Sequence, residues 1–379
     1  MTVNFPSHQS GTATKAEART GLSSVPKPTL TAGEVSQDPA LRDFLAPEFD
    51  LNGKAVLVTG GSGSFGKAFV RTVLDRYEPS RLIVFSRDEL KQYEMAQEFP
   101  AEKYPCLRFF IGDVRNRDRL EMAMRDVDFV IHAAAMKQVT TAEYNPLECI
   151  HTNVLGAENI VHAALSTDVK KVIALSTDKA ANPINLYGAS KLAADKIFVA
   201  ANHMSGGRST FSVVRYGNVV GSRGSVVPLF QKMIAEGADH LPITDTRMTR
   251  FWITLLQGVN FVLSSMALMQ GGEIFVPKIS SLSMPDLASA LAPSLPQKIV
   301  GIRPGEKLHE SLITEDDGRC TLEMADRYVI EPAFAWWSRE SYPADMASPV
   351  SEGFVYSSDN NAELAGPQWL SNLLEEPRI

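Results

Sequence analysis

Cysteine is scarce in this chain of 379 residues, and what is missing excludes several classes of protein. The three cysteines, Cys106, Cys149 and Cys320, are far apart and lack the spacing of metal ligands. This argues against a disulfide framework and a zinc site, and it indicates a reducing compartment. We therefore expect a cytoplasmic protein without a bound metal.

Long apolar runs and basic runs are also lacking. No apolar stretch approaches the roughly 18 residues that span a bilayer, so we expect no membrane partner. The formal net charge is -7 and lysine and arginine form no run, so we expect no nucleic-acid partner. The composition, 44% hydrophobic and 21% charged, is ordinary for a globular protein and remains compatible with a small anionic ligand.

Composition divides the chain into four parts. Residues 1–50 are rich in Ser, Thr, Ala and Pro, which predicts a flexible tail, with an organelle transit peptide as the alternative. Residues 51–220 are predicted to form the main domain. Residues 221–335 are predicted to form mainly a smaller lobe and to add some strands to the main sheet. Residues 336–379 have no clear period and are interpreted as a C-terminal extension.

Strand and helix patterns alternate regularly from Lys54 onward. Short apolar runs separated by helical periodicity occur at 55–58, 82–85, 107–111, 129–132, 172–175 and 211–214. This alternation predicts an α/β fold, a Rossmann-type doubly wound parallel sheet with helices on both faces. The pattern then loosens, and we expect helices near 226–236, 256–269 and 284–291 and a strand at 273–276. The smaller lobe would cover the carboxyl edge of the sheet, where ligands bind in such folds.

A glycine-rich turn follows the first predicted strand. Glycines at positions 60, 63 and 66 let the backbone turn sharply, approach a pyrophosphate and pack a helix against the strand. The helix N-terminus offers free N–H groups to the anion. An ordinary turn is the alternative interpretation. The residues predicted to bind a dinucleotide here are Thr59, Gly60, Gly63, Ser64, Phe65 and Gly66.

The end of the second predicted strand indicates which dinucleotide binds. Ser86, Arg87 and Lys91 lie about twenty residues beyond the last glycine, where this fold meets the adenosine ribose. Arg87 and Lys91 would bind a 2'-phosphate through charge-assisted hydrogen bonds, which predicts NADP. Asp88 beside them would instead suit the ribose hydroxyl of NAD.

Small and acidic residues follow the third and fourth predicted strands. Asp113 could bond the adenine amino group, and Val114 follows it. Ala133, Ala134 and Ala135 leave room for the cofactor to lie against the backbone. We include all five in the predicted cofactor site.

Tyr187 and Lys191 lie four residues apart after the fifth predicted strand. On a helix they share one face, so the ammonium would lower the pKa of the phenol and make Tyr187 a base near neutral pH. Both residues would also contact the cofactor. Thr177, at the strand end, can supply a second hydroxyl to the substrate oxygen.

With these motifs, the sequence resembles the extended short-chain dehydrogenase/reductase family from Gly53 to about Ile330. The glycine turn together with Tyr187-x-x-x-Lys191 is that family's combination. Three longer stretches, 176–183 (STDKAANP), 215–219 (RYGNV) and 303–307 (RPGEK), are similar to the soluble UDP-N-acetylglucosamine 4,6-dehydratases. They look most like the C5-inverting type that begins pseudaminic acid synthesis. Gln138 and Thr140 depart from the His and Pro of these relatives.

The resemblance implies a lyase whose cofactor takes up hydride from the substrate and later returns it to the same molecule. Tyr187 would remove the 4-hydroxyl proton while hydride leaves C4 for NADP, and the resulting ketone acidifies the C5 proton. Lys179 would take that proton and return it on the other face, and Asp178 would protonate the departing C6 hydroxyl; the two roles are interchangeable. Hydride returns to C6, so a tightly bound NADP is recycled. Desolvation or a cation such as Lys191 would keep Lys179 partly neutral.

A UDP-sugar substrate and a homo-oligomer are also implied by the resemblance. Arg250 and Arg303 would suit the UDP diphosphate, because a guanidinium group binds phosphate in a bidentate manner. The predicted substrate-binding residues are Lys137, Asn182, Asn218, Arg250, Arg303 and Glu306. The alternatives are a retaining dehydratase, a nucleotide-sugar 4-epimerase, which would not need Asp178 and Lys179, and a non-catalytic NADP-binding sensor.

Overall fold

The computed structural model describes residues 42–333 and 342–365, together with Trp369. Most of the predicted tail, residues 1–41, lies outside the described residues. So do parts of the predicted C-terminal extension, at 336–341, 366–368 and 370–379.

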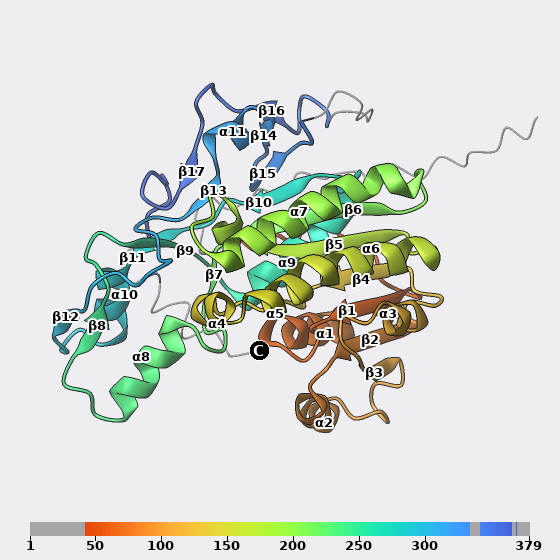
Figure 1. Ribbon diagram of the computed structural model, residues 1–379, viewed down its shortest axis with the longest axis horizontal. Helices are drawn as coiled ribbons and strands as arrows, with labels where there is room; N and C mark the ends of the chain where they lie inside the picture. Colours follow the sequence, from red (N-terminus) through yellow and green to blue (C-terminus); the bar gives the residue numbers. More distant parts are fainter. Residues whose placement is uncertain (1–41, 334–341, 366–368, 370–379) are drawn as a thin grey trace, which may run out of the picture. The chain divides into compact units, whose positions relative to one another are not determined.

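A mixed sheet of ten strands forms the centre of the described chain (Figure 1). Its parallel part has the order β3-β2-β1-β4-β5-β6, which is the doubly wound arrangement that the sequence predicts. The bounds are β1 Ala55–Thr59, β2 Arg81–Ser86, β3 Leu107–Ile111, β4 Phe129–His132, β5 Lys171–Thr177 and β6 Thr210–Tyr216. The predicted fold class is confirmed.

Four further strands extend this sheet beyond β6. β10 (Ile274–Pro277) continues it in parallel, and β15 (Arg327–Ile330), β14 (Thr321–Glu323) and β16 (Ser348–Pro349) each run antiparallel to the preceding one. These strands come from the part of the chain predicted to form mainly the lobe and from the predicted C-terminal extension.

Helices cover both faces of the sheet. α1 (Ser64–Arg76) packs against α9 (Leu255–Leu268), while α6 (Gly156–Ser166) packs against α3 (Arg117–Ala123) and α7 (Leu186–Ser205). Figure 1 shows α6 and α7 in front of the strands. Because both faces are covered, the inner strands are mostly apolar in their middle, and every residue of β1 is buried.

Shorter elements surround the carboxyl edge of the sheet. α8 (Val226–Ala235) and α10 (Met284–Leu291) share a separate apolar core that includes Phe230, Trp252 and Leu287. The remaining elements are α2 Glu89–Glu98, α4 Val139–Tyr144, α5 Pro146–Ile150, a π-helix His151–Leu155, a 3-10 turn Asp178–Ala180, β7 Asn218–Val219, β8 Leu241–Ile243, β9 Thr249–Ile253, β11 Ser281–Ser283, β12 Gln297–Ile299, β13 Ser311–Ile313, α11 Glu315–Gly318 and β17 Tyr356–Ser357. Among the residues described, no helix is long and apolar enough to cross a membrane.

The end of the predicted flexible tail is packed against α9. Phe44 is 2% exposed and meets the Phe261 ring edge to face at 5.2 Å. Asn260 Nδ2 donates to the Asp43 carbonyl at 2.8 Å, and Gln257 Nε2 donates to the Arg42 carbonyl. The predicted tail is therefore too long at this end. Its last residues, 42–50, hold Phe44 and Phe49, and these apolar residues, together with hydrogen bonds from α9 side chains, anchor a segment that the average composition of residues 1–50 concealed.

Candidate active site

A cavity of about 1340 Å³ lies at the carboxyl ends of the parallel strands. This exceeds the roughly 300–1,000 Å³ of a typical small-molecule site, so the cavity has room for a dinucleotide and a second ligand. The predicted site residues that line it are Gly60, Gly63, Ser64, Phe65, Gly66, Ser86, Arg87, Lys91, Asp113, Val114, Ala133, Ala134, Ala135, Lys137, Thr177, Lys179, Tyr187, Lys191, Asn218, Arg250, Arg303 and Glu306. The predicted site residues Thr59, Asp178 and Asn182 are not part of its lining.

The glycine turn has a backbone that side chains would disrupt. Gly60 has φ +65°, and a β-carbon there would lie 2.9 Å from the Cα and N atoms of Ala134. At Gly66 a β-carbon would lie 2.4 Å from the Gly61 Cα. Gly63 precedes α1 without a side-chain cap, so the first N–H groups of α1 remain available to an anion. The turn thus fits the pyrophosphate of a dinucleotide.

Thr59 lies behind this turn. It is fully buried, and its Oγ1 makes a 2.8 Å hydrogen bond with His132 Nδ1 and accepts one from the Ala134 N–H at 3.3 Å. Burial, aided by the charge of Lys191, lowers the pKa of His132 to about 3. A neutral imidazole and a threonine therefore join the ends of β1 and β4 beneath the cavity floor.

The predicted cations lie at the end of the cavity next to β2. Arg87 is largely exposed, with Nη1 3.7 Å from Asp113 Oδ2, and Lys91 Nζ lies 2.5 Å from Asp88 Oδ2. Ser86 Oγ accepts a hydrogen bond from Ser62 Oγ at 2.9 Å. Arg115 Nη2 also binds Asp113, at 2.7 Å, so that carboxylate is already shared between two guanidinium groups. The cations suit a phosphate, whereas Asp113 has little capacity left for adenine.

The candidate acid and base differ in their access to the cavity. Asp178 is fully buried, and its Oδ1 accepts hydrogen bonds from Thr177 Oγ1 at 2.8 Å and from Lys179 Nζ at 3.0 Å. Its Oδ2 accepts no hydrogen bond from the part of the chain that the structure describes. Thr177 and Lys179 line the cavity, so Asp178 would act through them.

The expected effect of Lys191 on Tyr187 is wrong. Burial raises the pKa of Tyr187 to about 12, although the charge of Lys179 and a hydrogen bond with Thr177 oppose this rise. Lys191 Nζ instead donates to the Leu175 carbonyl at 2.7 Å. The cation that acts on the phenol is Lys179, from the neighbouring 3-10 turn.

Lys179 is also not partly neutral, contrary to the sequence expectation. Burial would lower the pKa of its ammonium, but the carboxylates of Asp178 and Glu310 outweigh burial and raise that pKa above its ordinary value. The opposing cation is Arg250, not Lys191. Sequence reasoning missed Glu310, whose only signal was its place three residues after the RPGEK stretch.

The predicted substrate residues differ in how they relate to the cavity. Lys137, Asn218, Arg303 and Glu306 line it, and burial lowers the pKa of Lys137. Arg250 also lines it, but its guanidinium donates to the carbonyls of Lys307, Leu308 and Thr249 and so holds the 307–308 backbone.

Asn182 does not face the cavity. It is exposed with φ +46°, which a short polar residue tolerates, so it forms a turn. Asn185, at the start of α7, is the asparagine that connects α7 to the RPGEK loop. The Asn185 side chain caps α7 by accepting from Gly188 N and donates to the Gly305 carbonyl at 2.8 Å, which brings the RPGEK loop close to Tyr187.

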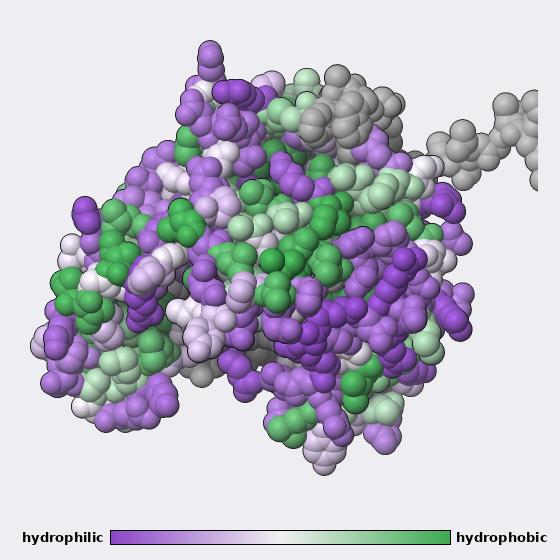
Figure 2. Space-filling view, viewed as in Figure 1, coloured by the Kyte–Doolittle hydropathy of each residue, from purple (hydrophilic) through white to green (hydrophobic). Residues whose placement is uncertain are grey.

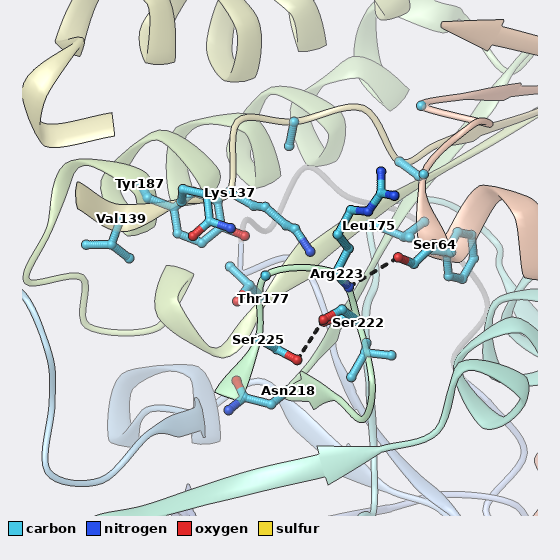
Figure 3. Close-up of a pocket in the computed structure, with 18 of the residues that line it drawn as sticks. Ser64, Lys137, Val139, Leu175, Thr177, Tyr187, Asn218, Ser222, Arg223 and Ser225 are labelled. Atoms are coloured by element: carbon cyan, nitrogen blue, oxygen red, sulfur yellow. Dashed lines mark hydrogen bonds between the residues drawn. The ribbon is translucent and has the colours of Figure 1, made fainter. Parts of the chain in front are cut away.

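A second missed element is the loop after β7. In Figure 3, Tyr187, Thr177 and Lys137 surround one space, and Arg223 comes from the loop on its other side. The Arg223 N–H donates to Ser64 Oγ at 3.4 Å, and Ser225 Oγ donates to the Ser222 carbonyl. This loop therefore reaches the first turn of α1. Its glycines and serines gave no sequence signal beyond that of a turn.

A doubly wound sheet, a glycine turn and a Thr177, Tyr187 and Lys191 set at one sheet edge define a nicotinamide-dependent enzyme of the short-chain dehydrogenase/reductase type. Residues 56–332 match the family described as "Polysaccharide biosynthesis protein", and the chain belongs to this family.

Relatives and solved structures agree with this assignment. A Campylobacter jejuni protein named UDP-N-acetylglucosamine 4,6-dehydratase (inverting) is 58% identical over 326 residues, 84% of this chain and 95% of the relative. The X-ray structure of Pen from Bacillus thuringiensis has a TM-score of 0.79 and 36% identity, covering 87% of this chain and 99% of its own. DesIV, a dTDP-glucose 4,6-dehydratase from Streptomyces venezuelae with NAD and TYD bound, has a TM-score of 0.59 and 26% identity, covering 67% and 86%.

Proposed function

We propose that the protein is a C5-inverting UDP-N-acetylglucosamine 4,6-dehydratase, a lyase that forms a UDP-4-keto-6-deoxy-L-arabino-hexose. The observation that carries the proposal is the Asp178 and Lys179 pair, because Lys179 lies on the wall of the cavity that Tyr187 also lines. A 4-epimerase needs the tyrosine but not this pair. The dehydratase name of the Campylobacter relative supports the same interpretation.

The first step needs a base at the substrate 4-hydroxyl. Tyr187 and Thr177 both line the cavity and would contact this oxygen. When bound, a nicotinamide would supply the hydride transfer, from C4 in the first step and to C6 at the end. Because burial raises the pKa of Tyr187, its deprotonation depends on the charge of Lys179 and the hydroxyl of Thr177.

The second step needs a proton removed from C5 and one delivered to the C6 hydroxyl. Lys179 lies on the cavity wall and would take the C5 proton, after its own proton has passed to Asp178 across 3.0 Å. The pair would then release one proton to the departing hydroxyl, so that water leaves. Because Asp178 is buried behind Lys179, delivery through Lys179 or Thr177 fits better than direct contact with the sugar.

NADP is the form of the cofactor that we propose, tightly bound and recycled. Arg87 and Lys91 would bind its 2'-phosphate. Asp113 is already paired with Arg115 at 2.7 Å, so it would compete only weakly with the phosphate for Arg87. Lys137 and Arg303 would bind the UDP diphosphate. The homo-oligomer, the cytoplasmic location and the pseudaminic acid pathway stay predictions from the sequence.

The test is incubation with UDP-N-acetylglucosamine in deuterated water without added reductant, followed by NMR. We expect a 4-keto-6-deoxy product with solvent deuterium and inverted configuration at C5. Retained C5 configuration would indicate a retaining dehydratase, and an unchanged skeleton inverted at C4 would indicate an epimerase. Tight NADP binding without turnover of any UDP- or dTDP-hexose would indicate a sensor.

A matched pair of lysine variants tests the proposed acid and base. Lys179→Ala should lower dehydration by roughly 10²–10⁴-fold and leave NADP bound, since general acid–base catalysis typically contributes that much. Lys196→Ala, on an exposed position of α7 outside the cavity, is the control. Full activity of Lys179→Ala would remove this assignment.

A further inference from the structure

Glu310 is a buried carboxylate at the cavity wall, just before β13. Its side chain is 3% exposed, and its Oε1 lies 3.2 Å from Lys179 Nζ and 3.9 Å from Arg250 Nε. Its Oε2 lies 3.7 Å from Lys307 Nζ and accepts no hydrogen bond within the described ranges. One carboxylate is thus surrounded by three cations, and the candidate catalytic lysine is the nearest of them.

The backbone of Glu310 is held by a residue near the end of the chain. Its N–H donates to Ser358 Oγ at 3.0 Å, and the Ser358 N–H donates to its carbonyl at 2.8 Å. Ser358 Oγ also makes a 2.7 Å hydrogen bond with Thr249 Oγ1, beside Arg250. Ser358 therefore fixes Glu310 and β9 together, so the carboxylate occupies a defined position relative to Lys179.

Lys179 requires such a partner because its side chain is long. A lysine has four rotatable bonds, and its compact ammonium takes up a single position only when hydrogen-bond acceptors fix it. Asp178 contacts Nζ from the 3-10 turn, and Glu310 contacts it from the segment before β13. A misplacement of about 1 Å at a reacting group can cost on the order of 100-fold in rate.

Resting on the proposed function, we propose that Glu310 is the positioning residue of Lys179, which holds Nζ between two carboxylates and directs it toward C5 of the sugar. Once Nζ has passed its own proton to Asp178, it takes the C5 proton, and the electron pair of the C5–H bond enters the 4-keto system. The C6 hydroxyl then leaves as water with one proton released by the Asp178 and Lys179 pair. Glu310 itself exchanges no proton in this step. Its charge is what acts on Lys179.

The charge of Glu310 also contributes to the pKa of Lys179, and therefore to how readily Lys179 passes its proton to Asp178. The groups that face Lys179 are the carboxylates of Asp178 and Glu310, the guanidinium of Arg250 and the phenol of Tyr187, with Lys307 behind Glu310. Glu310 is one of the two carboxylates that raise the Lys179 pKa. Its neutralisation must therefore lower that pKa.

The experiment compares Glu310→Gln with the wild type and with Glu323→Gln. Glu323 is a matched control because it pairs with Lys278 at 2.7 Å on the surface, outside the cavity. We expect Glu310→Gln to lower kcat and C5 deuterium incorporation by roughly 10- to 100-fold, with the KM little changed. The rise of kcat with pH should move to lower pH. Single-turnover reduction of NADP should lose less rate than dehydration, because that step depends on Lys179 only through its charge near Tyr187.

Several outcomes separate this inference from the proposed function. Wild-type protein that does not dehydrate the sugar would overturn the function, and the inference with it. An active wild type with Glu310→Gln equally fast and its pH profile unmoved would overturn the inference alone, as would an equal loss in the reduction of NADP. If Glu310→Gln does not fold, Glu310→Asp carries the test: it keeps the charge one methylene farther away, and both the rate and the pH profile should be intermediate.

Discussion

His132 is a titratable side chain that the fold keeps uncharged. It is 2% exposed, and Thr59 and the Phe198 ring contact it. Burial is the main reason that its pKa falls from 6.5 to about 3. Below pH 6.5 the unfolded chain therefore binds a proton at this ring that the folded chain does not bind.

The free energy of unfolding should consequently fall as the pH falls from 6.5 toward 3. Between pH 6.5 and 5 this ring alone contributes a loss of roughly 2 kcal/mol, at 1.36 kcal/mol for each pH unit. Urea unfolding at pH 7 and pH 5 measures it. His132→Gln, which keeps a polar group for Thr59, should show a pH dependence weaker by about that amount, and an equal dependence in both proteins would contradict the assignment.

The glycine turn is the element that we propose binds the cofactor. Gly60→Ala adds a β-carbon 2.9 Å from Ala134 in a left-handed backbone, so either the turn or the 133–135 segment after β4 must move. We expect NADP binding to weaken at least roughly tenfold and the free energy of unfolding to fall by roughly 1–3 kcal/mol.

Gly53→Ala is the matched control for this substitution. Gly53 has φ +67°, similar to Gly60, but it lies outside the cavity and a β-carbon there meets no described atom within 4 Å. It carries the left-handed strain without the close contact, so NADP binding measured by titration should stay near the wild-type value. Equal binding by both variants would show that the contact with Ala134 does not affect cofactor binding.

The elements that sequence patterns predict well are those whose burial is complete. Parallel strands such as β1 are covered on both faces, so they appear as apolar runs, and the helix α7 begins at an Asn185 cap. Strands of two to four residues, such as β14 and β16, have too few positions for a period to be seen. Their place in the main sheet is set by tertiary pairing alone.

At the scale of the whole molecule, the site depends on contacts between distant parts of the chain. The Tyr187-x-x-x-Lys191 spacing predicted one helix face, but not that Lys191 would bind the Leu175 carbonyl or that Lys179 would meet Glu310. Spacing within one helix is a local property of the sequence. The pairing of Lys179 with Glu310 arises only when the RPGEK loop folds back over the end of β5, so no local pattern could predict it.

The segment before β1 also connects to the site through a distant contact, with α9. Phe44 is 2% exposed against Phe261 of α9, and α9 in turn packs against α1, which follows the glycine turn. Replacing a buried Phe by Ala typically costs about 3–5 kcal/mol, so Phe44→Ala should lower the free energy of unfolding by about 3 kcal/mol. Leu45→Ala is the matched control, because Leu45 is 47% exposed and should change stability by less than about 0.5 kcal/mol. Chemical denaturation measures both variants. If they lost the same stability, the segment would not belong to the cooperative unit that carries the site.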